Sequence, residues 1–230
     1  MSHIVVLSGA GISAESGLKT FRDSDGLWMG YNIEDVATPR AYMKNPQLVL
    51  DFYNMRRREI AKANPNVAHI GLAELEKRHQ VTIVTQNIDD LHERAGSTNV
   101  VHLHGEIFKM RSTKNEELIA EIRTDINLGD KAPDGGQWRP HIVWFGEYPF
   151  NVDEAYTDIV NADYLIIVGT SLMIGYTLNL LSSTRDDCQI YYIDPNPSRY
   201  LDKYGKRVNY IEDIATIGVE KIVKIGRAHV

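Results

Sequence analysis

The fold class is decided by one stretch of the sequence, Ile4-Val-Val-Leu-Ser-Gly9-Ala10-Gly11-Ile12-Ser13-Ala14. It sets a glycine turn between a short apolar run and a segment that can start a helix. Such an apolar run is typical of a strand buried on both faces, and a helix after it offers free N–H groups to phosphate. Gly9 and Gly11 would let the backbone approach that phosphate. The stretch predicts a dinucleotide-binding α/β unit, although a tight turn without a ligand also fits it.

Short apolar, β-branched runs recur along the chain between longer helix-like stretches. Several lack the period-two alternation of a half-exposed strand, which indicates burial on both faces. Strands that alternate with helices form right-handed crossovers and a parallel sheet. We therefore predict a doubly wound α/β fold with a parallel, Rossmann-like sheet. The predicted strands are Ile4–Leu7, Val81–Val84, Val100–Leu103, Ile142–Phe145, Tyr164–Val168, Ile190–Ile193 and Val208–Ile211.

Two stretches interrupt this alternation. Residues 29–65 include Pro46–Met55, where apolar residues recur at helical spacings of three and four. Residues 109–139 include a predicted helix around Glu116–Ile122. We predict that these two insertions form a small, mostly helical second domain, beside a large domain of residues 1–28, 66–108 and 140–224. Residues 225–230 match the translation of a common sequencing-adapter DNA, so we expect them to be an artefactual tail.

Composition and charge narrow the function classes. The net charge of −6 gives no surplus of Lys and Arg for nucleic acid or an anionic membrane, so neither partner is expected. The longest apolar runs are far shorter than the roughly 18 residues of a membrane helix. Ile4–Leu7 lacks the basic flank of a signal peptide, so we expect a cytoplasmic protein. The single cysteine, Cys188, excludes an internal disulfide and a zinc site built from several cysteines.

The segment after the glycine turn disfavours a hydride-transfer dehydrogenase. Such an enzyme would carry an acidic residue at the end of its second strand, about 20 residues after the glycines. This sequence has the polar segment Thr20–Trp28 there. A loop with an arginine and aromatic residues suits a cover over a cofactor better than a strand.

Polar residues follow the predicted strands at their carboxyl ends, where ligands bind in open α/β folds. Gln86-Asn87-Ile88-Asp89 follows one strand, and the same run could also cap a helix that begins near Leu91. His104 follows the next strand, but His102 lies two residues earlier, so periodicity does not choose between them. Two further segments of this kind are Gly169-Thr170-Ser171 and Asp194-Pro195-Asn196.

Several motifs in a fixed order give the chain a resemblance to a known family. The motifs are Gly9–Gly17, Thr20-Phe21-Arg22, Gly26–Trp28, Gln86–Asp89, His104-Gly105 and Gly169–Ser171. In this order they resemble the sirtuin family, and the match extends from residue 8 to about 197. The resemblance implies an enzyme that consumes NAD. It would cleave the nicotinamide bond and transfer the acyl group of an acyl-lysine protein to ADP-ribose.

The resemblance also implies roles for single residues. His104 matches the family's general base, a task that suits an imidazole titrating near neutral pH, and Asn87 lies in the segment that orients NAD for cleavage. Family members usually have Asn at the position of Asp194, and Met173–Asn179 departs from their usual pattern. The residues implied to bind NAD are Gly9, Ala10, Gly11, Glu15, Thr20, Phe21, Arg22, Trp28, Gln86, Asn87, Ile88, Asp89, Gly169, Thr170, Ser171, Asp194, Pro195 and Asn196.

Tyr53 and Arg56 match a Tyr-x-x-Arg pair of the desuccinylase-like branch of the family. They are neighbours on one face if their segment is helical, and a guanidinium with a phenol can bind a terminal carboxylate. Ala37 matches a small residue that widens the acyl pocket. The resemblance thus implies activity on succinyl- or malonyl-lysine and leaves acetyl-lysine open. Alternatively, Arg56–Arg58 is a solvated helix face.

The segment Val143-Trp-Phe145-Gly146-Glu147 resembles the one that pairs with the substrate peptide by strand addition. A plain core strand is the alternative, and burial of Val143 and Phe145 is expected in both cases. The rival functions are a sirtuin-related NAD glycohydrolase and a non-catalytic module that binds NAD or ADP-ribose. Neither rival has a use for Tyr53 and Arg56.

Sirtuins usually carry four zinc-binding cysteines between the His-Gly motif and the Phe-Gly-Glu segment, but Lys109–Arg139 contains none. We therefore predict no structural zinc. Since such a site normally contributes folding energy, the small module must rely on apolar packing. The candidate packing residues are Ile107, Leu118, Ile119, Ile122, Ile126 and Trp138.

Overall fold

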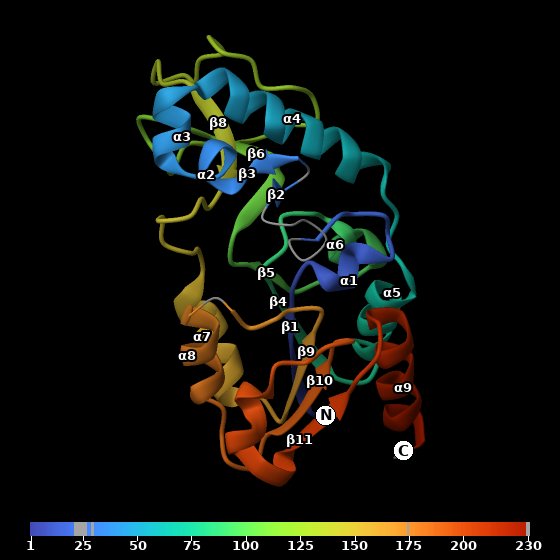
Figure 1. Ribbon diagram of the computed structural model, residues 1–230. Coiled ribbons are helices and arrows are strands. Elements are labelled where there is room, and N and C mark those ends of the chain that lie inside the picture. Colours follow the sequence, from blue (N-terminus) through green and yellow to red (C-terminus); the bar gives the residue numbers. More distant parts are fainter. Residues whose placement is uncertain (21–26, 29, 174, 229–230) are drawn as a thin grey trace.

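The computed structural model describes residues 1–20, 27–28, 30–173 and 175–228. Its core is a parallel sheet of six strands: β1 (His3–Ser8), β4 (Gln80–Thr85), β5 (Val100–His102), β9 (Tyr164–Val168), β10 (Gln189–Ile193) and β11 (Val208–Ile211). The strand order is β11-β10-β9-β1-β4-β5, so the winding reverses between β1 and β9 (Figure 1). Ligands bind at such a reversal in open α/β sheets. These strands confirm the predicted parallel sheet.

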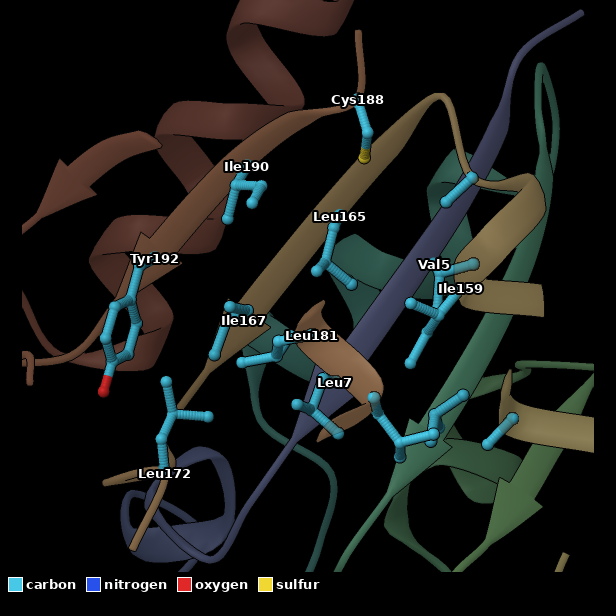
Figure 2. Close-up of a cluster of buried hydrophobic side chains, with 14 of the residues drawn as sticks. Val5, Leu7, Ile159, Leu165, Ile167, Leu172, Leu181, Cys188, Ile190 and Tyr192 are labelled. Carbon is cyan, nitrogen blue, oxygen red and sulfur yellow. The ribbon is translucent and has the colours of Figure 1, made fainter. Parts of the chain in front are cut away.

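Helices cover both faces of this sheet: α5 (Val67–Leu75) and α9 (Ala215–Ala228) on one, and α7 (Val152–Asn161) and α8 (Gly175–Ser182) on the other (Figure 1). Val5 and Leu7 pack with Ile159 and Leu181, as Figure 2 shows, while Val6 belongs to the opposite layer. Because neighbouring residues of β1 point to opposite faces and are all apolar, the strand needs cover on both sides. The fold is therefore doubly wound, as predicted.

Shorter elements complete this domain: α1 (Gly11–Ala14), α6 (Leu91–Ala95) and the 3₁₀ helix η2 (Arg199–Arg207). Helix α9 continues through Ala228, so its backbone includes the first part of the expected tail. Among the described residues, no helix has the length and apolar character needed to cross a membrane.

The first insertion lies beyond the carboxyl ends of β1 and β4 and is helical, as predicted (Figure 1). The hairpin β2 (Leu27–Trp28) and β3 (Tyr31–Asn32) leads into α2 (Ile33–Val36), α3 (Pro39–Lys44) and α4 (Pro46–Lys62). Proline stands in the first turn of α3 and of α4, where it costs no hydrogen bond. Thr38 Oγ1 accepts from Ala41 N at 3.0 Å and Asn45 Oδ1 from Leu48 N at 3.1 Å, which caps both helices.

The second insertion is not helical, which corrects the predicted helix at Glu116–Ile122. This segment contains β7 (Ile119–Glu121), which pairs antiparallel with β6 (Gly105–Ser112), and β8 (Trp138–Ile142) pairs with the other edge of β6. Leu118, Ala120 and Ile122 recur at period two and pack against a cluster around Leu50, Ile126 and Trp138. Ile119 points outward, 43% exposed, so its predicted packing role is wrong. The small domain is mixed rather than mostly helical.

The predicted core strand Ile142–Phe145 is also wrong, because β8 ends at Ile142 and belongs to the antiparallel sheet. Strands β6 and β8 cross the boundaries predicted after residues 108 and 139. Ile107 is buried as expected, but in a different cluster, with Phe52 and Trp144. The small domain therefore has two apolar clusters, one on each side of helix α4.

Candidate functional site

The turn after β1 lies directly against the turn after β9. Gly9 N donates to Val168 O at 3.0 Å and Gly11 N to Gly169 O at 2.8 Å. A Cβ on Gly9 would lie 2.7 Å from Thr170 Cβ, and one on Gly11 2.7 Å from Gly169 Cα. The contact between the two turns therefore requires these glycines, in addition to the phosphate approach predicted for them. It also brings the ends of β1 and β9 together at the reversal of the sheet.

Gly169→Ala is expected to lower the free energy of unfolding by about 2 kcal/mol. Its φ of +63° strains any L side chain, and the added Cβ would collide with Ile12 N. Urea denaturation measures the loss. Gly175→Ala is the matched control, because nothing lies within 4 Å of its Cβ position. Equal and small losses in both variants would contradict the tight contact.

His104 follows β5 and is held through one ring nitrogen. Its Nδ1 lies 2.8 Å from the carbonyl oxygen of Gln86, which can only accept, so Nδ1 carries the proton. Burial lowers the pKa of His104, against the opposing effect of the Gln86 hydrogen bond. The ring is therefore neutral near pH 7, with a lone pair on Nε2. Such a nitrogen can act as a general base.

The second ring nitrogen of His104 meets a residue that the sequence did not indicate. Tyr176, on α8, places its hydroxyl 2.6 Å from His104 Nε2. Tyr176 lies within Met173–Asn179, the segment that departs from the family pattern, and this departure was the only available signal.

His102 has both ring nitrogens engaged by the protein. Nδ1 lies 3.1 Å from Asn87 O and Nε2 lies 2.7 Å from Glu93 Oε1, and neither oxygen can donate when Glu93 is ionised. Burial alone would lower the pKa of His102, but the hydrogen bond and charge of Glu93 outweigh it, with help from Glu106, and the pKa is raised. His102 is thus a buried cation that supports the loop after β4. His102 is therefore a hydrogen-bonded residue of the core.

His102→Gln is expected to cost about 2 kcal/mol of unfolding free energy near pH 5.5. Because the folded pKa of His102 is raised, the stabilisation is complete below the unfolded pKa of about 6.5 and disappears as pH rises through the folded pKa. The difference in unfolding free energy between wild type and variant should therefore shrink from pH 5.5 to pH 9. Urea titrations across this range measure it. A gap that widens with pH would refute a charged His102.

Asn87 and Asp89 are fixed by the first turn of the chain. Asn87 Nδ2 donates to Gly9 O at 3.1 Å and lies 3.3 Å from Ser13 Oγ. Ser13 Oγ donates to Asp89 Oδ2 at 3.0 Å, and Leu91 N donates to Asp89 Oδ1 at 3.2 Å. Burial raises the pKa of Asp89. Asp89 therefore accepts from the first N–H of α6, whereas the N-cap residue itself, Asp90, makes no side-chain capping bond. Asn87 lies at the site. Ile88 packs partly buried beside the aromatic cluster of the small domain.

Of the remaining residues at strand ends, Thr170 is bonded to Gln86 at the site, whereas Asp194, Pro195 and Asn196 form a separate turn after β10. Thr170 Oγ1 donates to Gln86 Oε1 at 2.9 Å, so the ends of β4 and β9 are joined, and Ser171 follows half-buried. Asp194 is buried, and its Oδ1 accepts from Asn196 N at 2.9 Å. Pro195 and Asn196 are exposed beside it. Asp194 is therefore already used to shape its own turn.

The residues predicted to bind NAD in and near the cover loop lie in different surroundings. The carboxylate of Glu15 accepts from Thr216 N at 3.0 Å and Thr216 Oγ1 at 2.6 Å, so it binds the first turn of α9 instead of facing the site. Thr20 is half-buried, and the backbone of Trp28 lies in β2. Phe21 and Arg22 lie outside the described residues.

Tyr53 and Arg56 are buried on α4, with exposed fractions of 1% and 5%. Burial raises the pKa of Tyr53 and lowers that of Arg56. Arg56 Nη1 lies 3.4 Å from Glu59 Oε2, longer than the roughly 2.7–2.9 Å of a strong charged hydrogen bond. Ala37 is buried in the same cluster as Tyr53. The predicted acyl-pocket residues are therefore brought together on one side of α4.

The three consecutive arginines on α4 do not form a solvated face, so that alternative is wrong for two of them. Arg57 is buried, and it donates to Ile107 O at 2.9 Å and to Asn54 Oδ1 at 2.7 Å. Only Arg58 points outward, where it pairs with Asp125. Arg57 therefore joins α4 to β6, while Arg56 lies on the same face of α4 as Tyr53.

The segment after β8 is not a strand. Val143 N donates to His104 O and Phe145 N to Ala37 O, each at 2.9 Å, so these N–H groups are used inside the protein. Val143 is half-buried, but Phe145 is 51% exposed, so its expected burial is wrong. Gly146 is exposed with a φ of +92°. The segment links the residue after β5 to the acyl-pocket side of the small domain.

Glu147 joins an ion-pair cluster that the sequence did not predict. Its Oε1 accepts from Arg139 at 2.8 Å, Arg111 lies at 3.4 Å, and its Oε2 accepts from Trp144 N at 2.8 Å. Burial would raise the pKa of Glu147, but the hydrogen bond and charge of Arg139 lower it overall. The Arg139 guanidinium also stacks 3.3 Å over the Trp144 ring. Glu147 thus braces the small domain.

Comparison with known proteins decides the family. The Sir2 family profile matches residues 9–175, a span that contains the turn after β1, the loop after β4, His104 and the turn after β9. The chain belongs to the Sir2 family. The resemblance seen in the sequence is thereby confirmed.

Relatives of this Sir2 chain include proteins named NAD-dependent protein deacylase. One from Helicobacter pylori is 55% identical over 195 residues, 85% of each chain, and one from Bacteroides thetaiotaomicron is 44% identical over 232 residues, 98% of each chain. Among solved structures, a Sir2 homologue in complex with NAD has a TM-score of 0.88 at 35% identity, covering 99% of this chain and 90% of that one. A Sir2 homologue variant with ADP-ribose has a TM-score of 0.89 at 35% identity, covering 99% and 92%.

The zinc site that resemblance to the family implies does not fit the residues of this Sir2 chain. Residues 109–139 contain neither cysteine nor histidine. Within the described residues, no three His, Cys, Asp or Glu side chains gather as a metal ion would require. The end of β6 is instead fastened by Ser112 Oγ, which donates to the Asp134 carboxylate at 2.7 to 2.8 Å.

Proposed function

We propose that this Sir2 family chain is an NAD-dependent protein-lysine deacylase that removes succinyl, malonyl and acetyl groups. Nicotinamide, deacylated lysine and O-acyl-ADP-ribose are its products. The observation that carries the proposal is a neutral His104, with its lone pair on Nε2, where the carboxyl ends of β1, β4, β5 and β9 meet. The relatives named NAD-dependent protein deacylase support it.

The groups around His104 suit the nicotinamide-ribose part of NAD. The amides of Gln86 and Asn87, the Thr170 hydroxyl and the Asp89 carboxylate offer donors and acceptors within one hydrogen-bonded set. NAD, when bound, supplies the ribose hydroxyl and the leaving nicotinamide. His104 accepts the hydroxyl proton at Nε2, while the Gln86 carbonyl keeps the ring oriented. Asn87 is held in place by Gly9 O, and His102 supports its backbone.

The acyl preference rests on Tyr53, Arg56 and Ala37. A buried guanidinium beside a phenol that keeps its proton offers several donors to a terminal carboxylate. Succinyl and malonyl groups carry that carboxylate, whereas an acetyl group does not. Since the Ala37 side chain is small, it leaves room for the longer acyl chains beside Tyr53.

The peptide part of the substrate is assigned to Phe145 and Gly146, which are exposed. Their segment is held beside His104 and Ala37 by hydrogen bonds to the carbonyl oxygens of these two residues. Because Val143 N and Phe145 N already have acceptors, an extended peptide would pair with the carbonyl groups of this segment. An acyl-lysine protein is the proposed partner.

The test is incubation of purified protein with NAD and matched acetyl-, succinyl- and malonyl-lysine peptides, followed by mass spectrometry. Loss of the acyl mass should require NAD and should be accompanied by O-acyl-ADP-ribose. NAD consumption without any peptide product would favour the glycohydrolase rival. Binding of NAD without turnover would favour the non-catalytic module.

We also propose that the protein folds without zinc, because Ser112, Asp134 and the Arg111–Glu147–Arg139 cluster already join the strands of the small domain. Metal analysis should find far less than one zinc per chain. Excess chelator should leave the melting temperature unchanged. Stoichiometric zinc, or a fall of several degrees on chelation, would refute this.

A further inference from the structure

Tyr176 makes a direct hydrogen bond to the nitrogen that the proposed reaction needs. Since Nδ1 of His104 donates to Gln86 O, the Nε2 atom of the neutral ring can only accept. The Tyr176 hydroxyl, 2.6 Å away, must therefore be the donor. The two rings meet edge to face, with centroids 5.9 Å apart and an interplanar angle of 84°.

The protein fixes this phenol in its protonated form. Burial raises the pKa of Tyr176 to about 12, although the nearby Gln86 side chain opposes the rise. Helix α8 anchors the residue, because its neighbours Thr177, Leu180 and Leu181 are buried. Gln86 is in turn bonded by Thr170. Tyr176 thus joins the site through the same residues that are assigned to NAD.

We propose that Tyr176 is a further residue of the reaction centre that sets the affinity for NAD, because its hydroxyl occupies on His104 Nε2 the place of the cofactor's ribose hydroxyl. A neutral imidazole has one in-plane lone pair, so it accepts one short hydrogen bond. The ribose hydroxyl and the Tyr176 hydroxyl therefore compete for the same atom. NAD binds only when the phenol turns away.

This inference rests on the proposed role of His104, and it concerns residues of this chain in particular. Tyr176 lies just beyond residues 9–175, which the Sir2 family profile matches, in the segment that departs from the usual Sir2 pattern. The phenol protects the base from solvent while the site is empty. Its cost is a weaker apparent affinity for the cofactor.

The test is Tyr176→Phe, which removes the hydroxyl and keeps the ring. Calorimetric titration with ADP-ribose, which does not react, should give a Kd about three- to tenfold lower than that of wild type, since one competing hydrogen bond is lost. Tyr156→Phe is the matched control, because Tyr156 is a half-exposed residue of α7, and its Kd should equal that of wild type. An unchanged or higher Kd in Tyr176→Phe would overturn the proposal.

A second readout needs no ligand. Titration of the His104 ring by NMR should give a higher pKa in Tyr176→Phe than in wild type, because the phenol stabilises the neutral ring by donating to it. An unchanged pKa would show that the contact is absent in solution and would overturn the proposal. If the pKa rises but neither wild type nor variant binds ADP-ribose, the cofactor site itself is wrong, and the proposed function fails together with this inference.

Discussion

His104→Gln is expected to lower the rate of acyl transfer by about 10²- to 10⁴-fold, the usual contribution of a positioned general base. Glutamine can still donate to the Gln86 carbonyl in place of Nδ1, so the loop after β4 should keep its position. The lone pair of Nε2 is lost, and the ribose hydroxyl keeps its proton. Initial rates on a succinyl-lysine peptide at saturating NAD measure the effect.

His79→Gln is the matched control, because His79 lies between α5 and β4 and has no part in the proposed site. It should retain wild-type activity. The pH profile adds a second check: burial lowers the pKa of His104, so kcat/KM of wild type should rise with pH through a value below about 6.5 and then level off. A His104→Gln variant with more than a tenth of the wild-type rate would refute the assigned base.

Arg56→Met is expected to lower kcat/KM for succinyl-lysine by about 10²-fold or more, because truncating one partner of a buried charge pair costs about 2–5 kcal/mol. The succinyl carboxylate would then lie beside the apolar cluster that contains Tyr53 and Trp144, with only the Tyr53 phenol as a donor. Deacetylation should change by less than about fivefold, since an acetyl group has no charge to pair. The ratio of the two rates measured with matched peptides is the readout.

Arg58→Met is the control for this substitution, because Arg58 is a neighbour on α4 whose side chain is exposed and pairs with Asp125. Both rates should stay near those of wild type. Thermal melting of each variant separates a loss of fold from a loss of specificity. If Arg56→Met lowered desuccinylation and deacetylation equally, the acyl-pocket assignment would be wrong.

The large domain was predictable because its sequence carries strong local signals. Runs such as residues 165–168 are apolar at every position, which is typical of a strand buried on both faces. Polar residues at their carboxyl ends then had to meet at one edge of the sheet. Gln86 and His104, from different strand ends, are 2.8 Å apart between carbonyl oxygen and Nδ1.

The small domain was less predictable because its stabilising contacts are long-range. Leu118, Ala120 and Ile122 fit a helix as well as a strand over so short a run, and pairing with β6 decides between them. The cluster of Arg111, Arg139 and Glu147 joins residues whose sequence neighbours give no hint of it. Such pairs follow from the fold and cannot be read from spacing.

Individual side chains in the site were ambiguous for the same reason. Periodicity could not separate His102 from His104; the partners of each ring separate them, since Glu93 holds His102 and Gln86 holds His104. Glu15 lies in a motif of the family, yet its contact with Thr216 depends on the position of α9 in the folded protein. Tyr176 lies 72 residues after His104 in the sequence, and the two side chains meet because β5 and β9 end at the same edge of the parallel sheet.

The central claim is that His104 serves transfer of the acyl group from lysine to the ADP-ribose part of NAD, and counting products tests it most directly. Purified protein, NAD and a succinyl-lysine peptide should give one nicotinamide for each lysine deacylated, with no nicotinamide above background when the peptide is omitted. Nicotinamide released at the same rate without the peptide, or deacylation that proceeds without NAD, would contradict the claim.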